Sequence, residues 1–319
     1  MRRIKTISPI SETDLQHKGS DQMNIHQHTP FAEKSRTRLA YGMYIFSMLI
    51  FGTNGYLVAH MSIHSSQIVL LRTLIGGAVL TIIVLLRGGF HREAIKSERI
   101  PLLLGGTALG LNWVALFEAY RLLNVSLATL IYYGGPMLVL LLSPILFREK
   151  LTDWKLFAII LVAIGLIFIS GSIASGGMPT AGLLTAALAA LFYASLIVFN
   201  KKIIRTDGMQ TAALELDIAF VIVLLYTLLT VGLPHPRAAD YPYIAVIGLI
   251  NTGLAYMLYF SGLQRLPGQS VALISYIDPV SALLFSALLL DESMTTIQIF
   301  GAVLIIGGAI LGELKPKRR

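Results

Sequence analysis

The sequence predicts an all-α integral membrane protein with ten transmembrane helices arranged as two inverted five-helix repeats. Ten apolar segments follow one another between Leu39 and Leu314, and about 20 apolar helical residues are enough to cross a bilayer. Charged residues make up 13% of the 319 residues, against roughly 25% in soluble domains. The mean hydropathy of +0.73 agrees with this class. The third observation is an internal repeat, described below.

The polar segment 1–38 precedes the first apolar segment and is expected to be a cytoplasmic N-terminal tail. It has no apolar core like that of a signal peptide, so we expect the first span itself to target the chain. Residues 1–22 carry no structural signal, which leaves Met23 as an alternative start. His26 and His28 are interpreted as solvated side chains rather than metal ligands, and we expect no metal site.

The first repeat is expected at residues 39–172 and holds five apolar spans, which end where turn-forming or polar residues interrupt the hydropathy. The breaks fall at 62–65, from Gly88-Gly89 onward and at Leu123-Asn124. The spans that these breaks define are 39–60, 66–86, 100–121, 124–147 and 153–172.

The second repeat is expected at residues 180–313, after the turn Gly176-Gly177-Met178-Pro179. Prolines at Pro234 and Pro236 separate two of its spans, and Leu266-Pro267-Gly268 separates two others. The predicted spans are 180–200, 211–232, 241–263, 267–290 and 295–313. Residues 314–319 form a basic C-terminus.

Basic residues predict the orientation, because lysine and arginine accumulate in cytoplasmic loops. With the N-terminus inside, 22 Lys and Arg residues lie on the cytoplasmic side and two lie outside. Both termini are therefore expected in the cytoplasm, in a cell or inner membrane. The net charge of +8 follows this pattern of tails and alternate loops, which argues against nucleic acid as a partner.

Sliding the chain on itself by 143 residues reveals the repeat. The segment 130–136 falls on 273–279, so that Tyr133 meets Tyr276 and Pro136 meets Pro279. Glu149 also meets Glu292. Five is an odd number of spans, so the second copy must enter the membrane from the opposite side. Inverted repeats of this kind are typical of secondary transporters, although a duplication that merely built a stable bundle is the alternative.

The second half carries the motifs Asn251-Thr252-Gly253-Leu254-Ala255-Tyr256, Tyr276-Ile277-Asp278-Pro279 and Leu290-Asp291-Glu292-Ser293. A weaker version stands in the first half, at Tyr133-Gly134-Gly135-Pro136 and Arg148-Glu149-Lys150-Leu151-Thr152. Together they resemble the EamA-type branch of the drug/metabolite transporter superfamily, over nearly everything after the N-terminal tail. One departure is Asp278, where the family pattern has Glu, one methylene longer.

The resemblance implies ten helices around a central substrate cavity and the export or exchange of small metabolites. Amino acids or related compounds are our favoured substrates. Sugar phosphates, nucleotide sugars and drugs are the alternatives, because this superfamily handles several such classes. The expected partners are the lipid bilayer, a small-molecule substrate and, as a candidate coupling ion, the proton. A monomer or a weak dimer is expected, with no cofactor.

Asp278 is the first candidate substrate-binding residue. It lies near the middle of its span beside Pro279, which lacks the N–H that a continuous helix needs. A broken helix that lines a cavity is a typical place for substrate or proton binding, and an ionisable group in hydrocarbon usually faces a cavity or a partner. A kinked helix whose carboxylate bonds to a neighbouring helix is the structural alternative.

Arg72 and Glu215 are related by the 143-residue shift and each lies within a span. A guanidinium binds carboxylate or phosphate in a bidentate manner, so Arg72 together with carboxylates suits a zwitterion. A structural role for Arg72 is an equal alternative: the side chain would pair with a carboxylate or hold a gate closed. Glu215 and Asp217 point about 200° apart on one helix, so we expect only Glu215 in the cavity and Asp217 in a bond between helices.

The remaining candidate binding residues are polar or aromatic side chains near mid-span: Tyr133, Tyr276, Asn54 and Trp113. Helix packing is the alternative for each of them, and Tyr133 and Tyr276 are favoured because both repeats keep them. Pro136 and Pro279 are expected to break their helices. Glu118 and Arg121 are expected to form an i,i+3 ion pair near a helix end.

An enzyme is not expected, because the sequence holds no phosphate-binding loop, zinc-protease or serine-hydrolase motif. No cysteine is present, so neither a disulfide nor a thiolate metal site can form. A channel is a less favoured class, because no repeated filter or ring of like charges is visible.

Overall fold

The computed structural model describes residues 30–123, 125–170, 179–289 and 295–314, and all regular structure within these ranges is helical. The chain divides into two units, residues 1–39 and 40–319. In the first unit, the described residues 30–39 belong to a helix that starts at Pro30. The expectations about His26, His28, Glu292 and the basic C-terminus at 315–319 lie outside the described residues.

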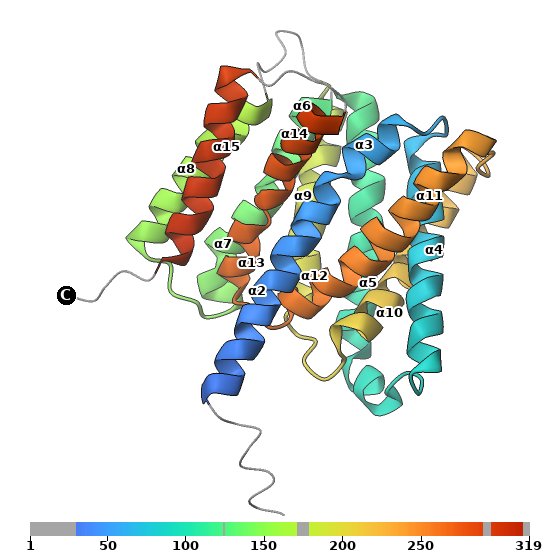
Figure 1. The fold of residues 1–319 in the computed structure, drawn as a ribbon, viewed down its shortest axis with the longest axis horizontal. Coiled ribbons are helices and arrows are strands. Elements are labelled where there is room, and N and C mark those ends of the chain that lie inside the picture. Colours follow the sequence, from blue (N-terminus) through green and yellow to red (C-terminus); the bar gives the residue numbers. More distant parts are fainter. Residues whose placement is uncertain (1–29, 124, 171–178, 290–294, 315–319) are drawn as a thin grey trace, which may run out of the picture. The chain divides into compact units, whose positions relative to one another are not determined.

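Up to residue 170 the structure describes seven helices, of which α2, α4 and α5 are the longest (Figure 1). They are α2 (Pro30–Gly52), α3 (Asn54–Ala59), α4 (Ser65–Leu86), α5 (Arg92–Leu122), α6 (Val125–Tyr132), α7 (Gly134–Leu146) and α8 (Asp153–Ser170).

The helices after residue 179 include two irregular turns, the 3₁₀ turn η1 and the π-helical turn η2. The elements are α9 (Thr180–Asn200), α10 (Gly208–Thr230), η1 (Ala238–Asp240), α11 (Tyr241–Gly248), η2 (Leu249–Leu254), α12 (Ala255–Leu263), α13 (Gly268–Ile274), α14 (Ile277–Leu289) and α15 (Thr296–Glu313).

Seven helical stretches among the described residues are long and apolar enough to cross a membrane. They are Ser35–Ala59, Ser65–Leu86, Arg92–Leu122, Thr180–Asn200, Gly208–Thr230, Ala238–Leu263 and Gly268–Leu289, and the shorter apolar helices Gly134–Leu146 and Thr296–Gly312 accompany them. Large apolar side chains point outward: Leu229 is 86% exposed and Ile145 is 80% exposed. Lipid tails can cover such a surface, so the chain is a multi-pass membrane protein. The total of ten spans stays a prediction.

The helix bounds differ from the expected spans at several places. The span expected from residue 100 begins at Arg92, because residues 92–99 are mostly good helix formers even though they are polar. The spans expected at 124–147 and 267–290 are each two helices, interrupted at Tyr133 and at Ser275-Tyr276. Hydropathy averages over a span, so it locates the span but not a break within it.

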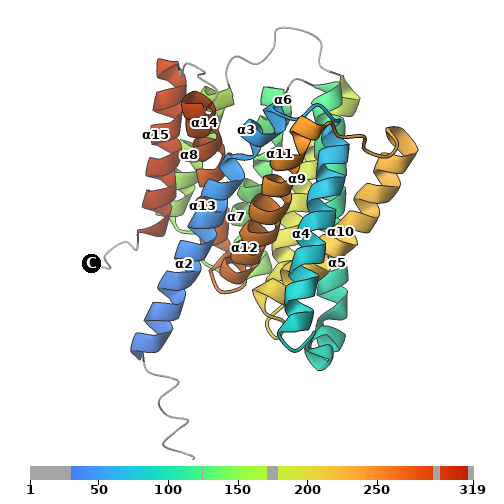
Figure 2. The ribbon, with the colours of Figure 1, turned by 45° about the vertical axis from the view of Figure 1, so that its right-hand side comes forward.

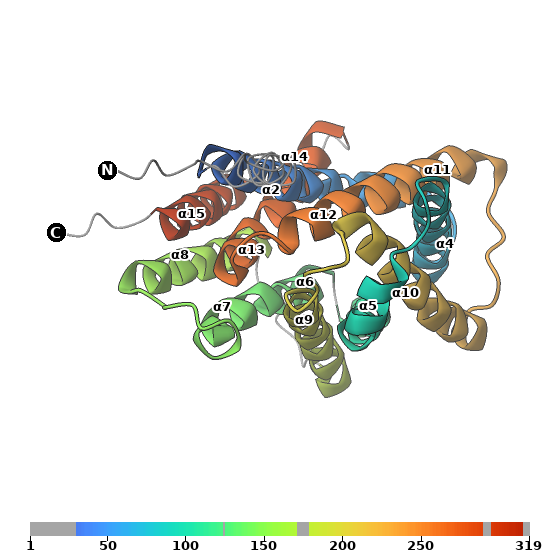
Figure 3. The same ribbon diagram turned by 90° about the horizontal axis from the view of Figure 1, so that it is seen from below.

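The helices of the second unit pack closely where glycines face a neighbouring backbone. α8 and α15 lie side by side in all three ribbon views (Figures 1–3). A Cβ atom added to Gly165 would lie 2.7 Å from the carbonyl oxygen of Gly301, so only glycine permits this approach. On the other side of the bundle, α5 packs against both α9 and α10 (Figure 3), and α4 packs against α10.

Carboxylates bind the backbone of connecting segments at the ends of the helices. Glu98, 5% exposed, accepts backbone N–H bonds from Ile204, Arg205 and Thr206 at 2.7–2.9 Å, and a hydroxyl bond from Thr206 at 2.7 Å. These four bonds fix the connection between α9 and α10 to the start of α5.

The carboxylate of Asp240 makes a similar set of hydrogen bonds, which joins the segment between α3 and α4 to the turn η1. Asp240 accepts the N–H of Ser62 at 2.9 Å, the Ser62 hydroxyl at 2.8 Å and the N–H of Arg237 at 2.8 Å. Ser62 and Arg205 are 143 residues apart, which is the shift of the internal repeat. In each repeat, therefore, a carboxylate near the start of a helix binds a connecting segment, and the two bound segments correspond in the repeat.

Candidate functional site

The breaks in two helices meet at Tyr133 and Asp278. Tyr133 lies between α6 and α7, and Asp278 lies in the first turn of α14 beside Pro279. The Tyr133 hydroxyl donates to Asp278 Oδ2 at 3.1 Å, and the Tyr276 hydroxyl donates to the carbonyl of Tyr133 at 2.9 Å. Tyr133 is 9% exposed and Tyr276 is 1% exposed, whereas Asp278 is half-buried. The two tyrosines that correspond in the repeat therefore contact each other at the breaks.

A group of hydroxyls surrounds Ser275, which precedes the second break. The Ser275 hydroxyl donates to the carbonyl of Val271 at 2.8 Å. It accepts a bond from the Tyr193 hydroxyl at 2.9 Å, and the Tyr44 hydroxyl lies 2.8 Å away. Helices α2, α9 and α13 are joined here, so the break in the last of them is held from two sides.

Arg72 lies on α4 and is 8% exposed. Its Nε donates to Thr252 Oγ1 at 2.8 Å and its Nη2 donates to the carbonyl of Asn251 at 3.2 Å. Both partners belong to the π-helical turn η2, in which the usual helical bonding is disrupted. The guanidinium carbon also lies 5.4 Å from the ring centroid of Trp113, so the charge sits over an aromatic face.

The guanidinium of Arg72 has no carboxylate oxygen within 4 Å among the described side chains, where Arg121 with Glu118 is the only ion pair. A buried cation without a direct counter-ion is costly in hydrocarbon, so this arrangement favours an anionic group beside it.

Asn54 also belongs to the surroundings of Arg72, through Asn251. The Asn251 side-chain amide donates to the Ile50 carbonyl at 2.9 Å, to Thr53 Oγ1 at 2.8 Å and to Asn54 Oδ1 at 3.1 Å. These acceptors flank the break between α2 and α3. The turn η2 therefore connects the broken first helix to Arg72.

Aromatic rings extend from the Arg72 side toward the Ser275 side. Trp113 makes an edge contact with Tyr256 at a centroid distance of 5.6 Å. Tyr256 contacts Tyr259 at 5.8 Å, and Tyr259 contacts Tyr44 at 5.2 Å. The Tyr259 hydroxyl is buried and has no hydrogen-bond partner within the described part of the chain. These rings form a buried aromatic cluster that carries a few hydroxyl groups, a combination of side chains also found in small-molecule sites.

Glu215 lies apart from this group. It is 0% exposed, and both carboxyl oxygens lie 3.0 Å from the side-chain nitrogen of Asn200. Asp217 faces another neighbour and accepts a bond from the Thr81 hydroxyl at 2.7 Å, which confirms the expected bond between helices. The structure thus places Tyr133, Tyr276 and Asp278 in one group of contacts. Arg72, Trp113 and, through Asn251, Asn54 form a second group, and Glu215 lies outside the hydrogen bonds of both.

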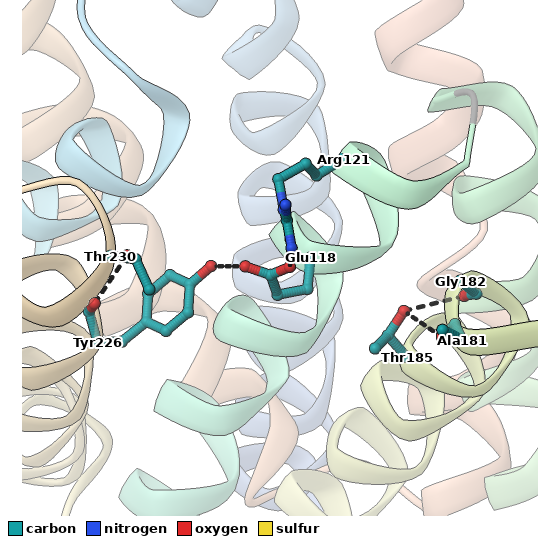
Figure 4. A network of polar contacts seen from close by, with 7 residues as sticks. All are labelled: Glu118, Arg121, Ala181, Gly182, Thr185, Tyr226 and Thr230. Atoms are coloured by element: carbon teal, nitrogen blue, oxygen red, sulfur yellow. Dashed lines mark hydrogen bonds and ion pairs between the residues drawn. The ribbon is translucent and has the colours of Figure 1, made fainter. Parts of the chain in front are cut away.

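Glu118, Arg121 and Tyr226 form a separate polar network near the end of α5 (Figure 4). Arg121 Nη2 lies 2.7 Å from Glu118 Oε2, which confirms the expected i,i+3 ion pair. The Tyr226 hydroxyl of α10 donates to the other oxygen of Glu118. The Arg121 side chain is 66% exposed, so solvent screens this pair and it contributes little to stability.

Sequence reasoning missed Tyr44, Ser275 and the role of Asn251 and Thr252. The last two stand in the motif at 251–256. A polar Asn-Thr-Gly run within an apolar span was the available signal, because such residues need hydrogen-bond partners in hydrocarbon.

Comparison with known proteins identifies similar sequences and a similar fold. The EamA-like transporter family matches the chain twice, at residues 38–171 and 180–312. The uncharacterized transporter YxxF of Bacillus subtilis is 28% identical over 271 residues, which cover 84% of this chain and 87% of that protein. A probable terminal-alkyne amino-acid exporter of Streptantibioticus cattleyicolor is 33% identical over 32% of this chain and 35% of its own length. One crystal structure superposes with a TM-score of 0.76 at 20% identity, over 88% of this chain and 97% of the other.

Proposed function

The chain belongs to the EamA-like transporter family, and from this premise we propose that it is a secondary carrier that exports or exchanges a small metabolite. The family is one of transporters rather than enzymes, and a membrane transporter acts in a lipid bilayer on a small-molecule substrate. The proposed location is the cell or inner membrane, with both termini in the cytoplasm, as the distribution of 22 inner and two outer basic residues suggests.

The proposed architecture is ten transmembrane helices in two inverted repeats, at residues 39–172 and 180–313. Two observations support it. The family matches twice along the chain, and the helix breaks at Tyr133 and at Ser275-Tyr276 stand in corresponding places of the 143-residue repeat. Two similar halves of opposite orientation can exchange conformations, which gives alternating access to a site between them.

The substrate is proposed to bind near Arg72, Asp278, Tyr133 and Tyr276. The observation that carries this proposal is the buried guanidinium of Arg72, which has no carboxylate oxygen within 4 Å among the described residues. An anionic group of the substrate would bind Arg72 in a bidentate manner, while Asp278 would receive its cationic or hydroxyl group. Trp113 and Asn54 would hold Arg72 and its surroundings in place.

This arrangement fits a zwitterion, so amino acids or related compounds are the proposed substrate class. The relative from Streptantibioticus cattleyicolor, whose name describes an amino-acid exporter, supports the same choice. A sugar phosphate or another anionic metabolite is the second candidate, because the uncompensated charge of Arg72 alone would favour a phosphate.

A comparison of extracellular metabolites tests the proposal. Cells that overproduce the wild-type protein are compared with cells that carry equal membrane amounts of the Arg72→Ala, Asp278→Ala double variant. We expect one class of zwitterionic metabolite to accumulate outside only with the wild type, since the double variant lacks both charges. Accumulation of phosphorylated compounds would favour the second candidate. Equal export by a single Asp278→Ala variant would remove Asp278 from the site.

A further inference from the structure

Glu215 is a buried carboxyl group that the proposed substrate site does not use. It lies on α10, is 0% exposed and points toward α5 and α9. A Cβ atom added to Gly105 of α5 would lie 2.1 Å from Glu215 Oε1, so the carboxyl fills the space that this glycine leaves. The next residue of α5 is also closely packed, since a Cβ on Gly106 would lie 3.0 Å from the Glu215 Cα. The carboxyl is therefore enclosed by protein.

The hydrogen bonds of Glu215 are too few for an ionised carboxylate. The Asn200 side-chain nitrogen carries two hydrogens but lies near three acceptors, namely both Glu215 oxygens at 3.0 Å and the Leu196 carbonyl at 3.1 Å. Glu98 of the same chain shows the contrast, because it accepts three backbone N–H bonds and one hydroxyl bond. A fully buried charge with about one donor is strongly disfavoured.

The charged groups on the helices around Glu215 are either exposed or engaged elsewhere, and the exposed ones are Arg92, Glu93, Lys96 and Arg99 of α5. Arg72 of α4 binds the turn η2, and Glu118 of α5 pairs with Arg121. Glu98 of α5 and Asp217 of α10 bind Thr206 and Thr81. No cationic nitrogen lies within 4 Å of Glu215 among the described residues.

Lys201, which follows α9, is not a counter-ion of Glu215 either. Burial lowers the pKa of Lys201 to about 8, and the attraction that opposes this shift comes from Glu149. The tyrosines of α12, Tyr256 and Tyr259, pack against the aromatic rings described above. Neutralisation of Glu215 by a neighbouring cation is therefore not available in this conformation.

A second observation concerns Asn200. Its side-chain oxygen is buried and has no hydrogen-bond partner within the described part of the chain. An O–H on Glu215 would need an acceptor, and a rotation of the Asn200 amide would present this oxygen to it. With the amide rotated, a Glu215 O–H would donate to the Asn200 oxygen and give that oxygen a partner, and the Asn200 nitrogen would give up its bond to the Leu196 carbonyl.

We propose that Glu215 carries a proton in this conformation and is a proton-binding site of the carrier, separate from Asp278. The coupling part of the inference rests on the proposed function. The carboxylic acid would lose its proton to water when the interface of α5 and α10 opens, leaving a carboxylate, and would regain one before the interface closes. Proton movement and substrate movement would then share one conformational change.

Infrared spectroscopy of the purified protein in lipid tests protonation directly, through the carbonyl stretching band of protonated carboxylic acids. We expect this band at neutral pH in the wild type, its specific loss in Glu215→Gln and its retention in the matched control Glu118→Gln, whose carboxylate is ion-paired. An unchanged band in folded Glu215→Gln would overturn the proposal. If that variant does not fold, Glu215→Asp is expected to move the band, and an unmoved band would overturn it equally.

Transport measurements test the coupling separately. In liposomes, Glu215→Gln is expected to lose transport driven by a pH gradient but to keep exchange of substrate for substrate. Gradient-driven transport that survives in this variant would overturn the coupling role, even with a protonated Glu215. If the wild type moves no substrate at all, the proposed function fails, whereas the infrared result still decides whether Glu215 holds a proton.

Discussion

Replacing Arg72 with glutamine is expected to reduce substrate exchange by roughly 30- to 4,000-fold. Removing one member of a buried, hydrogen-bonded charge pair costs about 2–5 kcal/mol, and every 1.4 kcal/mol is tenfold in affinity. Glutamine removes the charge that would bind the anionic group of the substrate. The measurement is exchange of labelled substrate in liposomes at several substrate concentrations.

Two further variants separate the charge of Arg72 from its contacts with the protein. Arg72→Lys keeps a positive charge but loses the fork that binds Thr252 and Asn251 together, so we expect partial recovery. Thr252→Val removes one of these contacts and keeps the guanidinium, so its effect is expected to be much smaller. Wild-type exchange by a folded Arg72→Gln protein would contradict the proposed role.

Glu98→Ala is expected to give the largest loss of stability. The change leaves three backbone N–H groups of the connection between α9 and α10 without their acceptor. At about 1 kcal/mol or more for each unsatisfied donor, the loss is about 3 kcal/mol or more. With about 2–4 °C of melting temperature for each kcal/mol, the midpoint should fall by roughly 6–12 °C.

A thermal unfolding assay in detergent measures the effect of Glu98→Ala. The matched control is Glu93→Ala, because Glu93 is an exposed residue on the same helix and accepts no hydrogen bond from the residues that the structure describes. The free energy of unfolding of that control should stay within about 0.5 kcal/mol of the wild-type value. Equal melting of the two variants would show that water replaces the carboxylate at this connection.

The helical membrane fold could be predicted because hydropathy and helix length are properties of local sequence. The positions of the helix breaks were harder to predict than the spans. Pro136 and Pro279 mark places where a helix lacks a backbone donor, but only the folded chain places the interruptions at Tyr133 and Ser275-Tyr276. The turn η2 has no proline, so its irregular hydrogen bonding depends on contacts with other helices.

The candidate site was predictable as a set of residue types but not as a set of contacts. Polar groups within apolar spans must find partners, which singled out Arg72, Asp278 and Glu215. The internal repeat related Tyr133 to Tyr276, yet it could not show that one hydroxyl reaches Asp278 and the other reaches a backbone carbonyl. Glu215 corresponds to Arg72 in the repeat, but their neighbours differ, so corresponding positions have different environments.

The measurement that tests the central claim most directly is exchange by the purified protein in liposomes. The liposomes are loaded with an unlabelled candidate metabolite, and uptake of the same labelled compound is followed over time. The account predicts saturable uptake that internal substrate stimulates and that Arg72→Gln largely removes. Uptake that rises linearly with concentration and ignores internal substrate would indicate a channel, and would contradict a carrier with its binding site at Arg72 and Asp278.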